Sequence, residues 1–405
     1  MKKSILFGLL GGILGATSVM AANYDLYLTG STAFRANAFT ACQKLYDGGT
    51  PASANNGTGA PASGDSRWTM SGTCVNLGLT SGSDTLTIHA LWTGSVQGLS
   101  ALANKDQLVF LASATPANTT LKTNSASACL SDVFSAPTLD PLSSGSFTEK
   151  KVACQPFIFV KSKAPGGVQS ITNINWQQLQ FLLGNGSAPL SYFTGKASDA
   201  TTNIYLIHRT LDSGTRVTTV QEAQFIGNIP VNYYDPIADS YSPALTNRGP
   251  DAFGPGYVGG GDVKTVLQYA NPGNQAIAYL SFGDAKAITG VNWEKMLAFN
   301  GQYPIANYVP GTAPSTNDFS PIGYGNYSFW AWEMLDCPKS GQWSGYSDQN
   351  LSFTQLTGII NKLSGTGTGS IDNEIVLSEA AGTATAARLS EVPVTRSAVG
   401  GVIAP

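Results

Sequence analysis

Apolar and polar positions along the chain follow two periods, which together predict strands that are each followed by a helix. Segments 24–28 and 85–92 alternate as strands do, and the continuous apolar run 204–207 is typical of a short buried strand. A turn rich in glycine and hydroxyl side chains follows each of them. The helical segments after these turns are 34–46, 99–104 and 217–225. We therefore expect an α/β fold with mostly parallel strand pairing.

The rest of the chain continues the alternation with two long interruptions. Further strands are predicted at 108–111, 157–160 and 276–280, further helices at 176–183, 263–269, from 284 onward and at 353–363, and an aromatic core segment at 327–334. Segments 48–73 and 117–150 are polar and rich in small residues, so we expect surface insertions there. Residues 365–405 are predicted to form a low-complexity linker and a tail without assigned structure.

One turn has the composition of an anion site. After the strand 204–207, Arg209 precedes Asp212-Ser213-Gly214-Thr215, which supplies N-cap chemistry for the next helix. The free N–H groups and the dipole of a helix N-terminus favour negative charge, and an arginine offers a planar fork to an oxyanion. The alternative interpretation is an ordinary helix cap beside a solvated arginine.

Similar turns follow other strands. Segments 29–33 and 93–98 combine glycine with hydroxyl side chains, and 112–116 ends another strand. Ligands of open α/β sheets bind where strand ends meet helix starts, so the turns at 29–33, 93–98 and 212–215 are expected to face one cleft.

Composition narrows the possible functions. The 405 residues suggest about two domains, and only 12% are charged, with 22 Lys+Arg against 25 Asp+Glu. A nearly neutral chain has no broad electrostatic surface for nucleic acid. Two scattered histidines and no CxxC motif provide no metal site, and no cofactor is predicted.

The first residues resemble an export signal. Lys2 and Lys3 form a basic start, 5–19 is apolar, and Val19-Met20-Ala21 fits a cleavage site. We expect cleavage after Ala21, a periplasmic or secreted location without a lipid anchor, and no stable membrane insertion.

Five cysteines in an exported chain suggest two disulfides and one free thiol. The pairings between neighbours in sequence are Cys42 with Cys74 and Cys129 with Cys154, which would leave Cys337 free. Other pairings remain open.

The turns, in this order, resemble those of the substrate-binding protein of bacterial phosphate ABC transporters. Four motifs carry the resemblance, over about residues 24–290: Gly30-Ser31-Thr32-Ala33-Phe34, Gly94-Ser95-Val96-Gln97-Gly98, Ala112-Ser113-Ala114-Thr115-Pro116, and Arg209-Thr210-Leu211-Asp212-Ser213-Gly214-Thr215. The resemblance implies two α/β lobes that close on phosphate or a similar oxyanion. It also implies a transporter permease as a partner.

Carried over by motif, the ligand-binding residues are Ser31, Thr32, Phe34 and Ser95 from one lobe and Arg209, Ser213, Gly214 and Thr215 from the other. The implied organisation is a signal peptide (1–21), the first lobe (22–155 with insertions at 48–73 and 117–150, then 275–364), the second lobe (156–274), and the linker and tail (365–405).

The sequence departs from the family pattern in two places. The aspartate of the family's Arg-x-Asp pattern is Leu211 here, with Asp212 one position later. The family's cleft aspartate, which accepts a proton from hydrogen phosphate and excludes sulfate, falls at Ala114. The favoured function is thus an oxyanion-binding protein without catalytic residues. One alternative is a secreted surface or matrix protein that reuses the fold with weak or no anion binding, and a second is a phosphatase-like enzyme, although Ser213 has no identifiable base.

Overall fold

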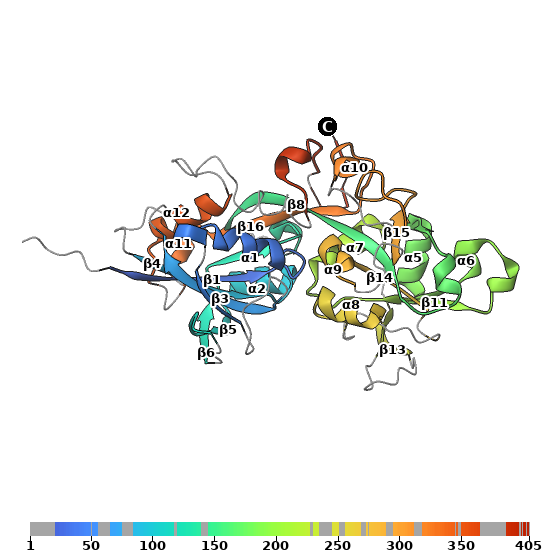
Figure 1. Ribbon diagram of the computed structural model, residues 1–405, viewed down its shortest axis with the longest axis horizontal. Helices are drawn as coiled ribbons and strands as arrows, with labels where there is room; N and C mark the ends of the chain where they lie inside the picture. Colours follow the sequence, from blue (N-terminus) through green and yellow to red (C-terminus); the bar gives the residue numbers. More distant parts are fainter. Residues whose placement is uncertain are drawn as a thin grey trace, which may run out of the picture.

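Two α/β lobes lie side by side and are joined by two long strands, β8 (Phe147–Lys161) and β16 (Trp330–Pro338), as Figure 1 shows. The structure is a computed structural model. It describes residues 21–49, 51–55, 65–74, 84–116, 120–138, 145–226, 230–234, 245–250, 256–268, 273, 275–288, 295–311, 318–344, 346, 350–364, 386–396, 398, 400, 401, 403 and 404. The predicted signal peptide therefore lies almost entirely outside the described residues.

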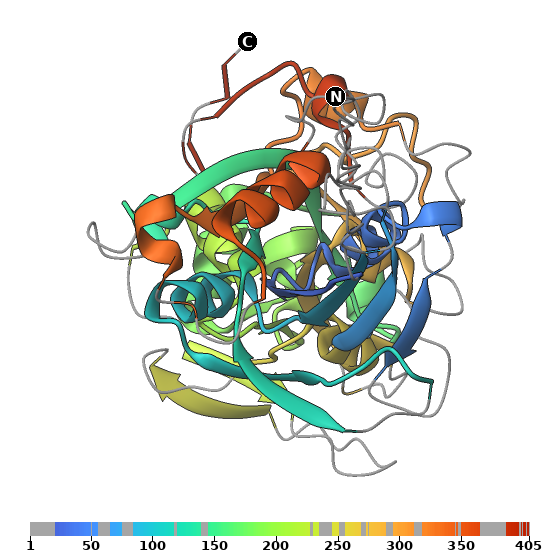
Figure 2. The same ribbon diagram turned by 90° about the vertical axis from the view of Figure 1, so that its left-hand side faces the viewer.

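The first lobe contains five strands of the main sheet, a separate two-stranded sheet and five helices. The main-sheet strands are β1 (Asn23–Gly30), β2 (Ala52–Asn55), β3 (Arg67–Thr73), β4 (Thr85–Leu91) and β7 (Ala128–Ser131), and the separate pair is β5 (Gln107–Leu111) with β6 (Leu121–Ser125). The helices are α1 (Arg35–Gln43), α2 (Ser95–Asn104), α3 (Ser135–Thr138), α11 (Ser340–Trp343) and α12 (Phe353–Ser364). α12 packs against both β8 and β16, on the side that faces the viewer in Figure 2.

The remaining elements belong to the second lobe or lie beside the crossover. The strands are β9 (Asn173–Ile174), β10 (Ser187–Pro189), β11 (Asn203–Ile207), β14 (Ala276–Ser281), β15 (Met296–Phe299), and the pair β12 (Pro230–Tyr234) and β13 (Leu245–Pro250). The helices are α5 (Trp176–Asn185), α6 (Ser191–Thr194), α7 (Gly214–Glu222), α8 (Gly260–Gln268), α9 (Phe282–Lys286) and α10 (Ser320–Gly323).

The main sheet runs through both lobes in the order β10-β11-β14-β8-β16-β7-β1-β4-β3-β2. β1 pairs in parallel with β4 and β7, and β11 pairs in parallel with β14, which confirms the α/β class. The crossover strands β8 and β16 run antiparallel to their neighbours, so the sheet is mixed.

Each lobe has its own apolar core. Leu26, Leu28 and Ile88 belong to the first, whereas Leu206, Ile277 and Leu280 belong to the second. β8 passes from one core to the other between Ala153 and Cys154, and β16 returns between Met334 and Leu335. The crossover strands are therefore buried in both cores.

The segments 48–73 and 117–150, predicted as surface insertions, contain buried strands of the main sheet, so the prediction is wrong for these described parts. β3 pairs with β4 along its whole length and buries Trp68 and Met70 completely, while β7 lies between β1 and β16. Both segments are polar on average, but a few large apolar side chains at alternating positions are enough to bury one face of a strand.

The expected disulfides are absent, since Cys42, Cys74, Cys129, Cys154 and Cys337 are all free and buried. Cys129 belongs to the first core and Cys154 to the second, so strand register separates these two thiols. Cys42 and Cys74 lie together in the first core without a bond between them.

The C-terminal segment 386–404 has a defined position, although the sequence predicted no structure for it. Ala387 exchanges two backbone hydrogen bonds with Cys154 of β8, at 2.9 and 3.0 Å. Arg396 donates to the carbonyls of Trp330 (2.8 Å) and Ser328 (3.0 Å) and forms a buried ion pair with Glu222 of α7 (3.1 Å). The segment thus lies over the crossover strands, at the top of Figure 1.

Among the described residues, no helix combines the length and the apolar character needed to cross a membrane.

Candidate functional site

Residues from both lobes meet between the N-termini of α2 and α7. The first lobe contributes Thr32 after β1, Ser95 at the start of α2 and Asp132 after β7, and the second contributes Arg209 after β11 and Gly214 at the start of α7. All but glycine are buried polar side chains. Both helices begin earlier than the sequence predicted, so their free N–H groups lie directly at the glycine and hydroxyl turns.

Arg209 connects the lobes. Its Nη2 donates to Thr32 Oγ1 at 3.1 Å and to the carbonyl of Val258 at 2.6 Å, while its Nε donates to the carbonyl of Tyr257 at 3.0 Å. Burial lowers the pKa of Arg209, whereas nearby Asp284, Tyr279 and Asp132 raise it and Arg35 lowers it further. An arginine held by neutral acceptors keeps its positive charge available to an anion.

Asp132 faces Ser95. The Ser95 hydroxyl donates to Asp132 Oδ1, and the backbone N–H of Asp132 donates back to Ser95 Oγ at 3.3 Å. Burial raises the pKa of Asp132 to about 6, although the Ser95 hydrogen bond and the charge of Arg209 both act to lower it. Asp132 can therefore gain or lose a proton close to neutral pH.

The two lobes touch at Gly214. A Cβ at this position would come within 1.5 Å of Asp132 Oδ1 and 2.9 Å of Ser95 Cβ, so only glycine permits this approach. Beside it, the N–H of Val96 donates to the carbonyl of Asp212 at 3.1 Å. The structure is consequently a closed one, with the two helix N-termini facing each other.

The other predicted site residues surround this centre. Ser213 caps α7 by accepting from the N–H of Arg216 at 3.3 Å, and Thr215 is buried in the first turn of that helix. Ser31 accepts from the N–H of Phe34 at 3.2 Å. Phe34 is fully buried in the first apolar core. The structure thus brings Thr32, Ser95, Arg209 and Gly214 together and gives Phe34 a packing position.

A second interlobe contact lies next to the first. Arg35 Nη2 of α1 forms an ion pair with Asp284 Oδ1 of α9 at 2.8 Å, and the two side chains are only 13% and 8% exposed. A cavity of about 480 Å³ opens beside this pair and shares Thr32 with the Arg209 contact.

Asp132 was not among the predicted site residues, and the motif comparison considered only Ala114 for an aspartate. Ala114 lines a different cavity of about 410 Å³, together with Asp25 and Thr87 of the first lobe. A signal for Asp132 was present in the sequence, because this carboxylate directly follows the apolar segment 128–130 and Ser131, the residues of the buried strand β7.

Two more carboxylates are buried beneath the site, on β16. Glu333 and Asp336 are fully buried, and their carboxylate oxygens have no partner at ordinary hydrogen-bond geometry among the described residues. Burial raises the pKa of both well above the ordinary value. The charge of Asp132 raises the pKa of Glu333 further, against a smaller opposite effect of Ser31, and Glu149 raises that of Asp336 further. Burial thus favours the neutral form of both side chains.

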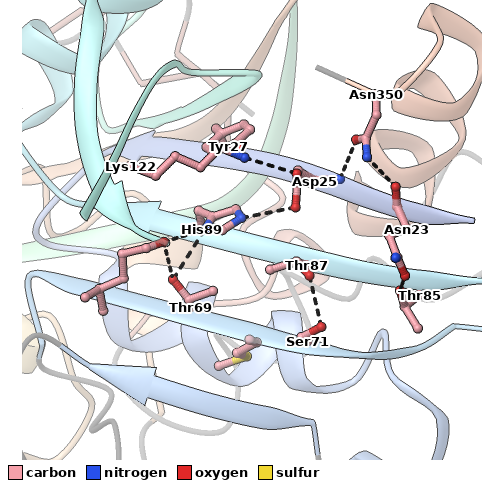
Figure 3. Close-up of polar contacts among 12 residues, drawn as sticks. Asn23, Asp25, Tyr27, Thr69, Ser71, Thr85, Thr87, His89, Lys122 and Asn350 are labelled. Atoms are coloured by element: carbon pink, nitrogen blue, oxygen red, sulfur yellow. Dashed lines mark hydrogen bonds and ion pairs between the residues drawn. The ribbon is translucent and has the colours of Figure 1, made fainter. Parts of the chain in front are cut away.

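A polar network on β1 and β4, shown in Figure 3, lies outside the interlobe site. Asp25 pairs with His89 Nε2 at 3.2 Å and with Lys122 Nζ at 3.3 Å, and His89 Nδ1 lies 2.7 Å from the carbonyl of Leu111. Tyr27 stacks on the His89 ring with centroids 4.7 Å apart. Asp25 is thus an ion-pair partner within the sheet and not a solvated or capping residue.

His208, the histidine nearest to Ser213 in sequence, is fully buried, and its Nδ1 lies 2.9 Å from the Tyr279 hydroxyl. Burial, reinforced by the charge of Arg216, lowers the pKa of His208 to about 3. Its ring is therefore neutral and directed at Tyr279. No group of three or more His, Cys, Asp or Glu side chains suited to a metal ion occurs among the described residues.

Comparisons with known proteins give a match in structure only. A scan against protein-family models finds none, and neither does a search of curated proteins. Similar solved structures include a putative phosphate ABC transporter substrate-binding protein with bound phosphate from Clostridium perfringens, with a TM-score of 0.47, 12% identity, and coverage of 90% of this chain and 99% of that chain.

Two others are a phosphate-binding protein from Stenotrophomonas maltophilia (TM-score 0.47, 12% identity, 91% of both chains) and an ABC-type phosphate transport receptor from Vibrio cholerae (TM-score 0.41, 13% identity, 83% of this chain and 91% of that chain).

Proposed function

We propose that the chain is an exported binding protein that captures a protonated tetrahedral oxyanion, of the phosphate class, between its lobes. The observation that carries this proposal is the convergence of buried Arg209, the Ser95–Asp132 pair and two helix N-termini at the contact between the lobes. A buried anion needs many donors and a fixed cation, and these groups supply both. Delivery to an ABC-type permease is the transport role implied by the motifs.

Asp132 gives the site its selectivity. A carboxylate beside an anion repels it unless the anion carries a proton to donate, as hydrogen phosphate does and sulfate does not. Because the pKa of Asp132 is about 6, its carboxylate is ionised above that pH and rejects sulfate. Below about pH 6, the protonated side chain of Asp132 donates a hydrogen bond, so the site can also bind sulfate. We infer that Asp132 takes the role for which the sequence offered only Ala114.

Calorimetric titration of phosphate and sulfate into the signal-free protein tests the proposal. At pH 7.5 the wild type binds phosphate and not sulfate, and at pH 5 it binds sulfate as well. Asp132→Asn admits sulfate at both pH values. Arg209→Ala loses at least about 100-fold in phosphate affinity, since truncating one side of a buried charge contact costs about 3 kcal/mol or more.

Thermal unfolding of each variant shows whether it is folded. A folded wild type that binds neither anion at either pH contradicts the proposal and favours a surface protein that reuses the fold. Sulfate binding that is equal at pH 7.5 in the wild type and in Asp132→Asn removes the role of Asp132.

A further inference from the structure

The interlobe cavity has room for more than an inorganic anion. Its volume is about 480 Å³. A tetrahedral oxyanion has five heavy atoms and fills a small part of that space, whereas cavities of this size are ordinary for small organic ligands.

The cavity also adjoins the proposed anion site, because Thr32 belongs to both. Thr32 Oγ1 accepts from Arg209 Nη2 at 3.1 Å, and Thr32 is one of the residues that line the cavity. The other walls come from both lobes, with Trp92 and Gln97 on one side and Val258 and Gly259 on the other. A substituent on an anion held by Arg209 would therefore extend into the cavity and be covered by both lobes.

We propose that the anion carries an organic group, and that this cavity binds that group as the hydroxylated part of a phosphate monoester. The ester is bound as its monoanion, whose remaining P–OH still donates a hydrogen bond to Asp132. The inference rests on the function proposed above and assigns its substrate class. It concerns the part of the ligand that Arg209 and Asp132 do not recognise.

The wall chemistry fits a neutral, hydroxyl-bearing group. Leu91, Trp92 and Val258 provide apolar surface, and the carboxylates of Asp65 and Asp262 provide acceptors. Both carboxylates are oriented: Asp65 Oδ2 accepts from Asn55 Nδ2 at 2.9 Å, and Asp262 Oδ2 accepts from the N–H of Gly259 at 3.2 Å. Two acids would repel a second anionic group, whereas hydroxyls donate to them.

Trp92 gives an independent indication. It is only 3% exposed, it lines the cavity, and its indole N–H meets no acceptor among the described residues. A buried donor without a partner costs about 1–3 kcal/mol, and an oxygen of a bound ligand would remove that cost.

Gly261 allows the cavity to be filled without disturbing the anion contacts. It lies in the first turn of α8, and a Cβ there would meet only Arg35 Nη2, at 3.9 Å. Gly261→Leu thus places a side chain in the cavity. Gly341→Leu is the matched control, since Gly341 is exposed in the first lobe and a Cβ there meets nothing within 4 Å.

The experiment titrates inorganic phosphate, glycerol 3-phosphate and glucose 6-phosphate into the signal-free wild type and both variants at about pH 6, where a phosphate monoester is still partly protonated. We expect at least one ester to bind about tenfold or more tightly than inorganic phosphate. Gly261→Leu then lowers the affinity for that ester about tenfold or more, and it changes the affinity for inorganic phosphate by less than about twofold. Gly341→Leu changes neither affinity. Trp92→Phe lowers the affinity for the ester and leaves that for inorganic phosphate unchanged.

Other outcomes overturn the inference. If inorganic phosphate binds more tightly than both esters, or if Gly261→Leu weakens phosphate and ester equally, the cavity does not select an organic group, while the proposed function stands. If none of the three anions binds to the folded wild type, both proposals fail together.

Discussion

At the scale of single residues, the protein buries carboxylic acids near the interlobe site. Asp132 lies near the charge of Arg209 and has a role in the proposed anion site, whereas both carboxylate oxygens of Glu333 lack a hydrogen-bond partner of ordinary geometry among the described residues. A fully buried acid of this kind stays protonated in the folded chain and ionises in the unfolded one. Its effect on folding must therefore depend on pH.

Glu333→Gln tests this directly. The folded pKa of Glu333 lies well above its ordinary value of 4.5, so its contribution to stability is complete below about pH 4.5 and is lost as pH rises from there. We expect the wild type to lose up to about 1.4 kcal/mol per pH unit relative to Glu333→Gln above pH 4.5. Urea unfolding of both proteins at pH 4.5, 6 and 7.5 measures the difference. Parallel stability curves would mean that Glu333 is ionised when folded.

The residue scale also shows where sequence reasoning stopped. Arg209, Ser95, Thr32 and Gly214 were predicted because each lies in a short local motif, and the structure brings them together. Asp132 was missed because its strand, β7, has four residues inside a polar stretch. Only pairing with β1 and β16 identifies it as a strand, and pairing partners far away in sequence are invisible to a local pattern.

At the scale of elements, the C-terminal segment connects the crossover strands to α7. Arg396 stacks on Trp330 with its guanidinium carbon 4.3 Å from the ring centroid, while Glu222 at the end of α7 pairs with it. The other end of the same helix contributes Ser213 and Gly214 to the site. Through this pair, the segment stabilises the helix that carries half of the proposed anion site.

Arg396→Met should destabilise the protein by about 3–5 kcal/mol, because it leaves Glu222 buried without its cation. The double variant Arg396→Met with Glu222→Gln should recover most of that loss. Urea unfolding at pH 7 gives both values. Lys196→Met is the control, since it removes an exposed positive charge from the second lobe. Equal stability of Arg396→Met and the control would mean that the ion pair contributes nothing.

Strands and helices were predicted correctly where apolar residues recur with a clear strand or helix period. The strands β1, β4, β11 and β14 and the helices α5, α7 and α12 all lie close to their predicted positions. β3 and the segment 386–396 were not predicted, since each depends on one or two large side chains that find their partners only in the folded chain. The motif resemblance assigned 275–364 to the first lobe, whereas β14 pairs with β11 and shares the second apolar core, so the chain returns to the first lobe later than residue 275.

At the scale of the whole molecule, a largely buried ion pair joins the two lobes in their closed arrangement. It is formed by Arg35 and Asp284, and it lies beside the cavity. In an open form both groups would be hydrated, so removing one of them penalises the closed form alone.

Arg35→Met should therefore shift the ligand-free protein toward an open form. We expect a larger radius of gyration in small-angle X-ray scattering, and a weaker apparent phosphate affinity in proportion to the lost closed fraction. Saturating phosphate should restore the compact form. The double variant Arg35→Met with Asp284→Asn removes both charges, so its closed form buries no unpaired carboxylate. We expect it to populate the closed form more than the single variant, which distinguishes the cost of burying a charge from a loss of packing. An unchanged radius in Arg35→Met would show that other contacts hold the lobes together.

The crossover strands also set the order in which the chain can complete its structure. β7 and the first half of β8 are made early, yet both pair with β16, which is synthesised about 200 residues later. The first lobe therefore cannot finish its sheet until nearly the whole chain is available. A ribosome that has produced β1 to β8 holds an incomplete first lobe whose sheet has an open edge where β16 will pair.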